Sequence, residues 1–307
     1  MTRRAALFVL ALIVLAVTLP LLAPYEPGRT FRDYLHAPPM RPQLSGVVHP
    51  LVLADRIEQS YKADPTRTVP LPWFGAASDA PVFLLGADSF GRDVLSRLLY
   101  GARTSIGLAL MATLGAIAIG ALAGAWAGYR GGWIDESVMR VADFVLVLPV
   151  IYVVLVLRAV LPLVLPASTV FLLVSWIFVA VGWPFVAKGV RAIVAAERER
   201  EYVQAAQSLG AGPLRILARH LIPACGGYLI VQATLLLPAF IIAEATLSFV
   251  GLGFPDPVAS WGTMLAETAN IGSVSRFPWT LTPAVAIFVV VLCTNLLTAD
   301  RGTQNDR

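Results

Sequence analysis

Long apolar runs alternate along the chain with connections that hold most of its charged residues. A helix crosses a bilayer with roughly 17–25 predominantly apolar residues. Runs of about this length predict six spans, at residues 5–22, 105–128, 139–161, 169–190, 226–249 and 281–297. The pattern therefore predicts an all-α membrane protein with six transmembrane helices.

The composition agrees with a membrane location. Apolar residues make up 57% of the chain and charged residues 14%, whereas soluble domains average about 45–50% and about 25%. The net charge of +4 is small, so it does not indicate nucleic-acid binding. We interpret the basic residues as signals of membrane topology.

The sequence lacks the patterns of common catalytic and metal sites. An ATPase phosphate loop ends in Gly-Lys-Ser/Thr, but Lys62 follows a tyrosine and Lys188 follows an alanine. The three histidines, His36, His49 and His220, do not have the H-E-x-x-H spacing of a zinc site, and no G-x-S-x-G nucleophile motif is present. We therefore predict no enzyme activity, no cofactor and no metal site.

The first apolar run follows Arg3 and Arg4, which is also the pattern of a secretory signal peptide. The run is longer than a usual signal core, and Leu21-Leu22-Ala23 matches a small-x-small cleavage site poorly. We therefore predict a retained transmembrane anchor helix over residues 1–24.

The basic residues predict an orientation for the six spans. Short cytoplasmic connections carry an excess of Lys and Arg. The connection between the fourth and fifth spans is the richest, with Lys188, Arg191, Arg198, Arg200, Arg215 and Arg219 at or near it. This places both termini in the cytoplasm and the segment between the first two spans outside.

That extracytoplasmic segment, residues 25–100, is rich in proline, so long helices are not expected there. Leu51, Ala54, Ile57 and Tyr61 have helical spacing, and we predict one short helix over residues 51–62. The segment either folds back to cap the outer mouth of the protein or offers a docking surface to a soluble partner.

Two residue sets within the spans are candidate functional positions. Gly120, Gly124 and Gly128 recur every four residues and predict a flat face for close helix packing. Asp143 and Glu244 are carboxylates near membrane depth, where a charge usually faces a cavity or a partner, so they are candidates to line a pathway through the membrane. Because the ends of the predicted spans are imprecise, both carboxylates can instead lie at an interface.

The connection at residues 191–225 contains a polar helix, a Gly-Ala-Gly-Pro break and a second helical stretch. Residues 201–209 predict a short helix along the membrane face, with a low-relief side at two alanines and a sharp turn after it. Its candidate contact residues are Glu201, Tyr202, Gln204, Ala205, Ala206, Leu209, Gly210 and Pro223. The alternative is an ordinary solvated loop held by Glu/Arg pairs.

Four ordered stretches resemble the dipeptide/oligopeptide/nickel branch of binding-protein-dependent ABC importer permeases, specifically the C-type permease subunit. They are FLLGADSFGRDVLSRLLYGARTSIGLAL (83–110), GYRGGWIDESVMRVAD (128–143), EYVQAAQSLGAGPLRILARHLIPA (201–224) and AEATLSFVGLGFPDPVASWGTMLAE (243–267). Gln204 departs from the glutamate common in the family. The resemblance implies a type I ABC importer permease fold, with a transmembrane domain of five helices at 101–300.

The resemblance also implies a function and partners. The chain would move a solute, either a di- or oligopeptide or nickel or another small solute, across the bacterial inner membrane by alternating access. ATP would be hydrolysed by two ATP-binding subunits, and a second homologous permease and an extracytoplasmic solute-binding protein would complete the complex. The 191–225 loop would couple to the ATPase.

Two points stay open at this level. Asp256 and Trp261 are candidates for contact with the binding protein, although Trp261 can instead belong to the aromatic belt of the membrane interface. The alternative function is an ATP-independent membrane channel or secondary carrier, for which we expect inverted repeats within one chain.

Overall fold

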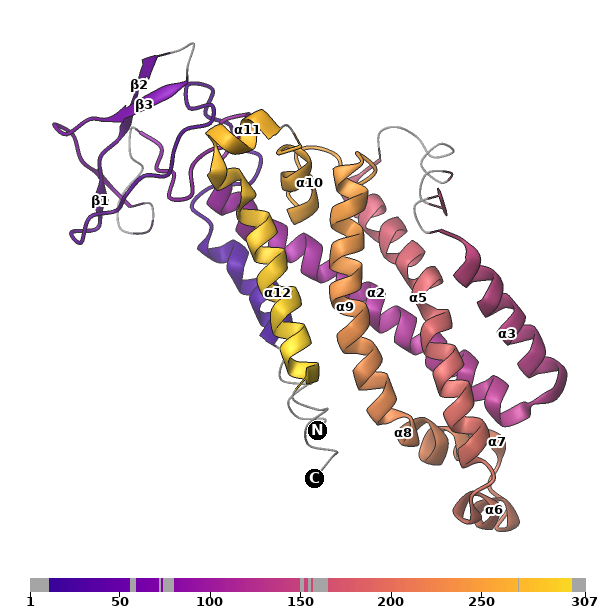
Figure 1. The fold of residues 1–307 in the computed structure, drawn as a ribbon. Coiled ribbons are helices and arrows are strands. Elements are labelled where there is room, and N and C mark those ends of the chain that lie inside the picture. Colours follow the sequence, from indigo (N-terminus) through magenta and orange to yellow (C-terminus); the bar gives the residue numbers. More distant parts are fainter. Residues whose placement is uncertain are drawn as a thin grey trace. The chain divides into compact units, whose positions relative to one another are not determined.

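The computed structural model describes residues 11–55, 59–71, 73, 80–149, 152, 153, 156, 165–269 and 271–299, and they are mostly helical (Figure 1). The chain divides into two units. The first comprises Met1–Leu10, Leu108–Ile242 and Val290–Arg307, and the second Ala11–Gly107 and Ala243–Val289. The long helices α2 (Val94–Arg130), α9 (Gly226–Phe249) and α12 (Thr282–Ala299) contribute residues to both units.

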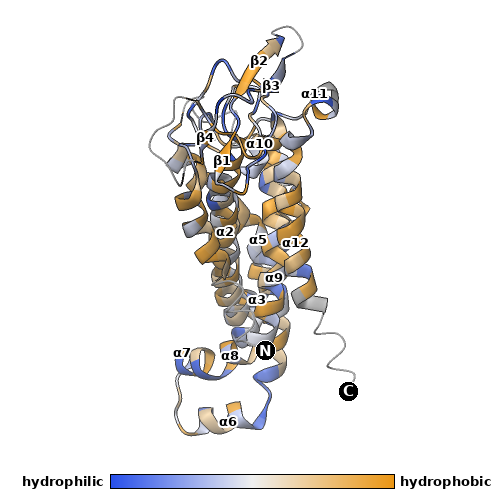
Figure 2. Ribbon diagram, turned by 90° about the vertical axis from the view of Figure 1, so that its left-hand side faces the viewer, coloured by the Kyte–Doolittle hydropathy of each residue, from blue (hydrophilic) through white to orange (hydrophobic). Residues whose placement is uncertain are grey.

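Within the described residues, 4 helices are long and apolar enough to cross a membrane: Val94–Arg130, Ala167–Glu197, Gly226–Phe249 and Pro278–Leu296. They coincide with the second, fourth, fifth and sixth runs of the sequence. Figure 2 shows the contrast in hydropathy between the largely orange α12 and the paler and bluer stretch around α6 and α7.

The first and third predicted spans are described only in part. A short apolar helix covers Ala11–Leu22 and ends in a 3-10 turn at Leu19–Leu22, while residues 5–10 lie outside the described part. Helix α3 (Gly132–Val147) includes the start of the third run, and most of residues 150–161 lie outside the description. The count of six spans therefore stays a prediction.

The first unit is built around α5 (Ala167–Glu197), whose buried residues follow its length from Val170 to Val194. Gly131 and Gly132 form the turn between α2 and α3 with φ of 66° and 57°, values that favour glycine. Helix α3 contacts α5. After α5 come the short helices α6 (Glu201–Ser208), α7 (Pro213–Ile216) and α8 (Ile222–Ala224).

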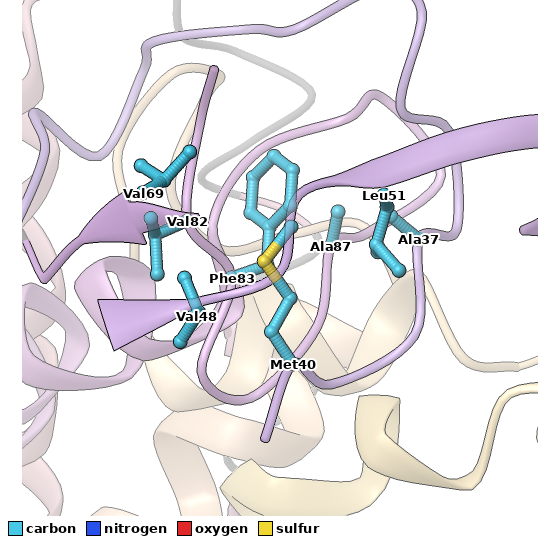
Figure 3. Packing of buried hydrophobic residues seen from close by; sticks show 8 residues of the cluster. All are labelled: Ala37, Met40, Val48, Leu51, Val69, Val82, Phe83 and Ala87. Atoms are coloured by element: carbon cyan, nitrogen blue, oxygen red, sulfur yellow. The ribbon is translucent and has the colours of Figure 1, made fainter. Parts of the chain in front are cut away.

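In the second unit, the described residues between positions 23 and 93 fold around a small apolar core (Figure 3). Two antiparallel pairs lie in this region: β1 (Val47–Val48) with β4 (Val69–Pro70), and β2 (Leu51–Asp55) with β3 (Ser60–Ala63). The core residues are Ala37, Met40, Val48, Leu51, Val69, Val82, Phe83 and Ala87. This part of the chain is therefore a packed structure with its own buried side chains.

The helix predicted over residues 51–62 is wrong, because the described residues there form a β-hairpin. Val52 pairs with Lys62 and Leu53 with Tyr61. Short apolar runs fit helical and strand periods equally well, and packing decides between them. Here Leu51 enters the core and the Tyr61 hydroxyl donates to the carbonyl of Leu35 at 2.7 Å.

The second unit also contains the helices that follow α9. They are α10 (Trp261–Ala266), α11 (Ile271–Arg276) and the 3-10 turn η3 (Pro278–Leu281). Ser260 caps α10 by accepting a hydrogen bond from the Thr263 backbone, and the Thr263 side chain accepts one in return. This capping box fixes where α10 begins.

Candidate functional site

Helix α6 is a short polar helix that is separated from the end of α5 by three residues. Val203 is its buried residue, whereas Glu201, Tyr202, Gln204 and Ala205 are exposed. The exposed side of the helix is polar, and the short Ala205 side chain leaves it without a bulky projection at that position. The helix thus has one side that packs against the protein and another that is free to meet a partner.

The end of α6 is set by Gly210. The Ala211 N–H donates to the Ala206 carbonyl at 3.0 Å, and the Gly210 N–H donates to the Gln207 carbonyl at 2.9 Å. This pair of bonds is a Schellman ending, which needs a residue with positive φ. Gly210 has φ of 82°, so glycine at this position makes the sharp turn possible. Leu209, just before it, has an exposed fraction of 88%.

The chain then returns through α7, a π-helical turn at Leu217–Leu221 and α8. Pro223 lies in α8 and has no N–H to donate, so the helical bonding must adjust around it. Ile216, Leu217 and Leu221 are buried. Together with Val203 they are the apolar residues on which the α6–α8 stretch is built.

The glycines at every fourth position of α2 lie against α5. A Cβ at Gly120 would come within 2.6 Å of the Trp183 carbonyl oxygen, and one at Gly128 within 2.6 Å of the Arg191 carbonyl oxygen. A Cβ at Gly124 would meet the Ala187 carbonyl oxygen still more closely. The two helices therefore approach backbone to backbone, which side chains at these positions would prevent.

Asp143, one of the two carboxylates considered for membrane depth, forms an ion pair with Lys188 of α5. The exposed fractions of the two side chains are 60% and 43%. The carboxylate thus has a cationic partner within its own unit.

Glu244 is 1% exposed and accepts three hydroxyl hydrogen bonds. Ser105 donates to Oε2 at 2.9 Å, and Ser248 and Ser260 each donate to Oε1 at 2.8 Å. The Trp261 N–H in turn donates to the Ser105 hydroxyl at 3.1 Å. Glu244 therefore joins the first part of α2 to the start of α10.

A second buried polar cluster, which sequence reasoning missed, lies at the start of α2. Arg97 donates to Asp88 at 3.0 Å and to Glu267 at 2.7 Å. Arg92 donates to the same two carboxylates at 2.7 Å and 2.8 Å. Both arginines are at most 5% exposed. The only signal in the sequence is the density of charges in Asp88–Arg97, directly beside an apolar span.

The two candidates for binding-protein contact differ in exposure. Asp256 has an exposed side-chain fraction of 69% and accepts a hydrogen bond from Arg92 at 3.0 Å. Trp261 is 3% exposed, and its ring N–H donates to the Leu98 carbonyl at 3.1 Å. The Trp261 ring is thus buried within its own unit and the Asp256 side chain is exposed, while contact of either residue with a binding protein stays a prediction.

Among the described residues, no group of three or more His, Cys, Asp and Glu side chains is arranged to hold a metal ion. The described residues instead form three structural features. Helix α6 is polar and packs on buried apolar residues, α2 and α5 are in close backbone contact, and buried polar side chains form hydrogen bonds within the second unit.

Comparisons with known proteins place this geometry in a family. The family model described as "Binding-protein-dependent transport system inner membrane component" matches residues 116–299. Helices α5, α6, α9 and α12 lie inside that range.

Curated relatives agree with this match. The "Di/tripeptide transport system permease protein DppC" of Pseudomonas aeruginosa (strain UCBPP-PA14) is 32% identical over 293 residues, 95% of this chain and 82% of that protein. The "Oligopeptide transport system permease protein OppC" of Bacillus subtilis (strain 168) is 37% identical over 196 residues, 64% of this chain and 62% of that protein.

A solved structure shows the same fold. The similar chain comes from "Inward facing conformations of the MetNI methionine ABC transporter", with a TM-score of 0.51 and 18% sequence identity. The match covers 68% of this chain and 95% of that chain. The fold is thus that of a type I ABC importer permease, and the chain belongs to the binding-protein-dependent inner membrane components, as an ABC importer permease of the dipeptide/oligopeptide branch.

Proposed function

We propose that this permease moves peptides into the cell by ATP-driven alternating access, with α6 as the element that receives the push of the ATPase. The observation that carries the proposal is the construction of α6. It exposes small and polar side chains on one side, is anchored by Val203 on the other, and ends in a fixed glycine turn.

The choice of peptides rests on the relatives, which are named for di- and tripeptides in one case and oligopeptides in another. A nickel complex or another small solute is the competing cargo within the branch. The peptide proposal is therefore tested by offering both classes of solute to the same complex.

The proposed complex has this chain, a second related permease, two ATP-binding subunits and a soluble solute-binding protein. In this arrangement α6 faces the cytoplasm and residues 23–93 lie outside. The positive charge around the connection from α5 to α9 supports that orientation, because Arg198, Arg200, Arg215 and Arg219 are all found there.

The proposal is tested with the purified complex in proteoliposomes. We expect uptake of a labelled dipeptide or tripeptide that requires both ATP and the binding protein, and no comparable uptake of a nickel complex. The isolated permease is the control and should give no flux. Selective flux through the isolated chain without ATP would instead favour a channel or carrier.

A further inference from the structure

Three basic side chains near the end of α5 form structural contacts, in addition to indicating the membrane topology. Lys188, Arg191 and Arg198 are each bonded to the α2–α3 region. Lys188 pairs with Asp143 of α3. All the residues involved belong to the first unit, and the bonds lie on the last turns of α5 and directly after it.

The Arg191 pair is the best defined of the three. Its Nε donates to both carboxylate oxygens of Asp135, at 2.8 Å and 3.1 Å, and Nη2 donates to Oδ2 as well. The Asp135 side chain is 14% exposed. These hydrogen bonds, with a smaller effect of charge, lower the pKa of Asp135 below its ordinary value. A two-pronged guanidinium–carboxylate contact fixes orientation as well as distance.

Arg198 ties the end of α2 to the same place. Its Nη1 donates to the carbonyls of Gly128 and Tyr129 at 3.2 Å and 3.3 Å. Carbonyls in the last turn of a helix have no partner within the helix, and a cation there also meets the negative end of the helix dipole. Arg198 therefore closes the α2 terminus onto α5.

Apolar packing alone accounts poorly for the position of α3. Ala142 is its buried residue among those described, while Trp133, Phe144 and Val147 have exposed fractions of 79%, 65% and 79%. By contrast, α2 meets α5 through the glycine face. The ion pairs of Asp135 and Asp143 therefore add specific polar contacts between α3 and α5.

Helix α6 is joined to the same body. Arg198, Glu199 and Arg200 separate α5 from α6. The Tyr202 hydroxyl donates to Glu197, the last residue of α5, at 2.7 Å. A displacement of α6 is thus passed to the end of α5, where the three cations are located.

We propose that Asp135, Asp143, Lys188, Arg191 and Arg198 form a brace that makes α3 and the end of α2 move with α5 and α6 as one body during transport. The inference rests on the proposed function of α6. Asp135 and Arg191 are positioning residues in it, because they act on transport through the helices they join.

The first test uses charge reversal in the reconstituted complex, with peptide uptake measured per ATP hydrolysed. Asp135→Arg and Arg191→Asp should each lower that ratio about tenfold, an effect typical of contacting pairs. The double variant should restore most of it. Glu136→Arg is the matched control, because Glu136 is exposed and, among the described residues, pairs only with Arg140 of its own helix. It should leave the ratio unchanged.

A normal ratio in Asp135→Arg, or no recovery in an assembled double variant, would overturn the brace. Failure of the proposed function looks different, since the unmodified complex would then show no ATP-dependent uptake. A general folding defect would lower the amount of assembled complex, whereas the brace predicts a lower ratio in complexes that do assemble.

The second test measures motion directly. Spin labels at Val141→Cys on α3 and Ser208→Cys on α6, with Cys225 and Cys293 replaced by serine, report their separation by pulsed EPR. The brace predicts the same distance in the nucleotide-free complex and in the complex trapped with ATP and vanadate. A distance that changes between the two states would overturn it.

Discussion

Arg97 shows at the scale of one residue how much of the second unit depends on buried charge. Its side chain is 1% exposed and joins Asp88 to Glu267, residues far apart in the sequence. Removing one partner of a buried ion pair leaves the other charge without compensation. No hydrophobic pattern contains this information, because the pairing partners are brought together only by the fold.

We predict that Arg97→Met lowers the stability of the protein by about 3 kcal/mol. Two carboxylates would lose a donor that water cannot easily replace. Arg103→Met is the control, since Arg103 lies on the same helix and is exposed. Thermal unfolding of the purified protein should show a clear decrease for Arg97→Met and little change for Arg103→Met. Equal effects would mean that the buried pairs contribute no more than an exposed arginine.

Because of Asp93, the stability of the folded protein should depend on pH in a direction that follows from its raised pKa. Burial raises its pKa to about 6, although the hydrogen bonds from Ser96 oppose the change. The folded protein therefore holds more protons on this group than the unfolded chain between about pH 4 and pH 6. Its contribution to stability is complete below pH 4 and is lost as the pH rises through 6, by about 3 kcal/mol.

The variant Asp93→Asn should remove this part of the pH dependence. Asparagine keeps an oxygen that can accept from Ser96, whose N–H and hydroxyl donate to Asp93 at 2.8 Å and 2.6 Å. The measurement is the unfolding temperature at pH 4 and at pH 7 for both proteins. A difference between the two pH values that is the same in the variant would contradict the assignment.

At the scale of elements, the sequence predicts those helices whose burial follows a simple period. Runs of apolar residues predict the helices α2, α5, α9 and α12, because a helix that crosses a membrane needs a long uninterrupted apolar stretch. The four-residue glycine repeat likewise corresponds to the face of α2 that lies on α5. The β2–β3 hairpin is different, because a short apolar run has no unique period and its packing partners are distant.

Because α2 packs closely on α5, we predict that one methyl group added to the glycine face of α2 lowers the stability of the protein strongly. Gly124→Ala would place Cβ against the Ala187 backbone, and overpacking of this kind costs about 1–3 kcal/mol. Gly227→Ala in α9 is the matched control, because nothing lies within 4 Å of its Cβ position. We expect less assembled and less heat-stable protein for Gly124→Ala only, as measured by thermal unfolding and by yield of the complex. Unchanged stability and yield in both variants would show that α2 and α5 do not pack as closely as described.

The site itself is partly visible in the sequence. The polar helix at 201–209 stands out because it interrupts apolar spans, and Gly210 stands out because a helix is followed by a Gly-Ala-Gly-Pro break. The hydrogen bond of Glu244 with Ser105 and the ion pairs of Asp135 and Asp143 cannot be seen in the sequence, because each joins residues at least 40 positions apart. Ser248 and Ser260 are nearer to Glu244 in the sequence, but no pattern marks them as its partners.

For the whole molecule, the proposed orientation follows from charge and has a direct chemical test. A cysteine at Ser60, an exposed residue of β3, should react in intact cells with a thiol reagent that cannot cross the membrane. A cysteine at Ser208 on α6 should react only after the membrane is opened. Both variants need Cys225 and Cys293 replaced beforehand. Labelling of position 208 but not of position 60 in intact cells would reverse the topology.

The central claim is that α6 passes the ATPase movement to the permease, and the most direct measurement is peptide uptake by complexes that carry one added charge on this helix. Ala205→Arg adds a bulky cation on the exposed side, opposite the buried Val203. Gln207→Arg adds the same side chain on another side of the helix. The account predicts that Ala205→Arg abolishes ATP-driven uptake in an assembled complex, while Gln207→Arg retains it. Normal uptake by Ala205→Arg, with all subunits present, would contradict the account.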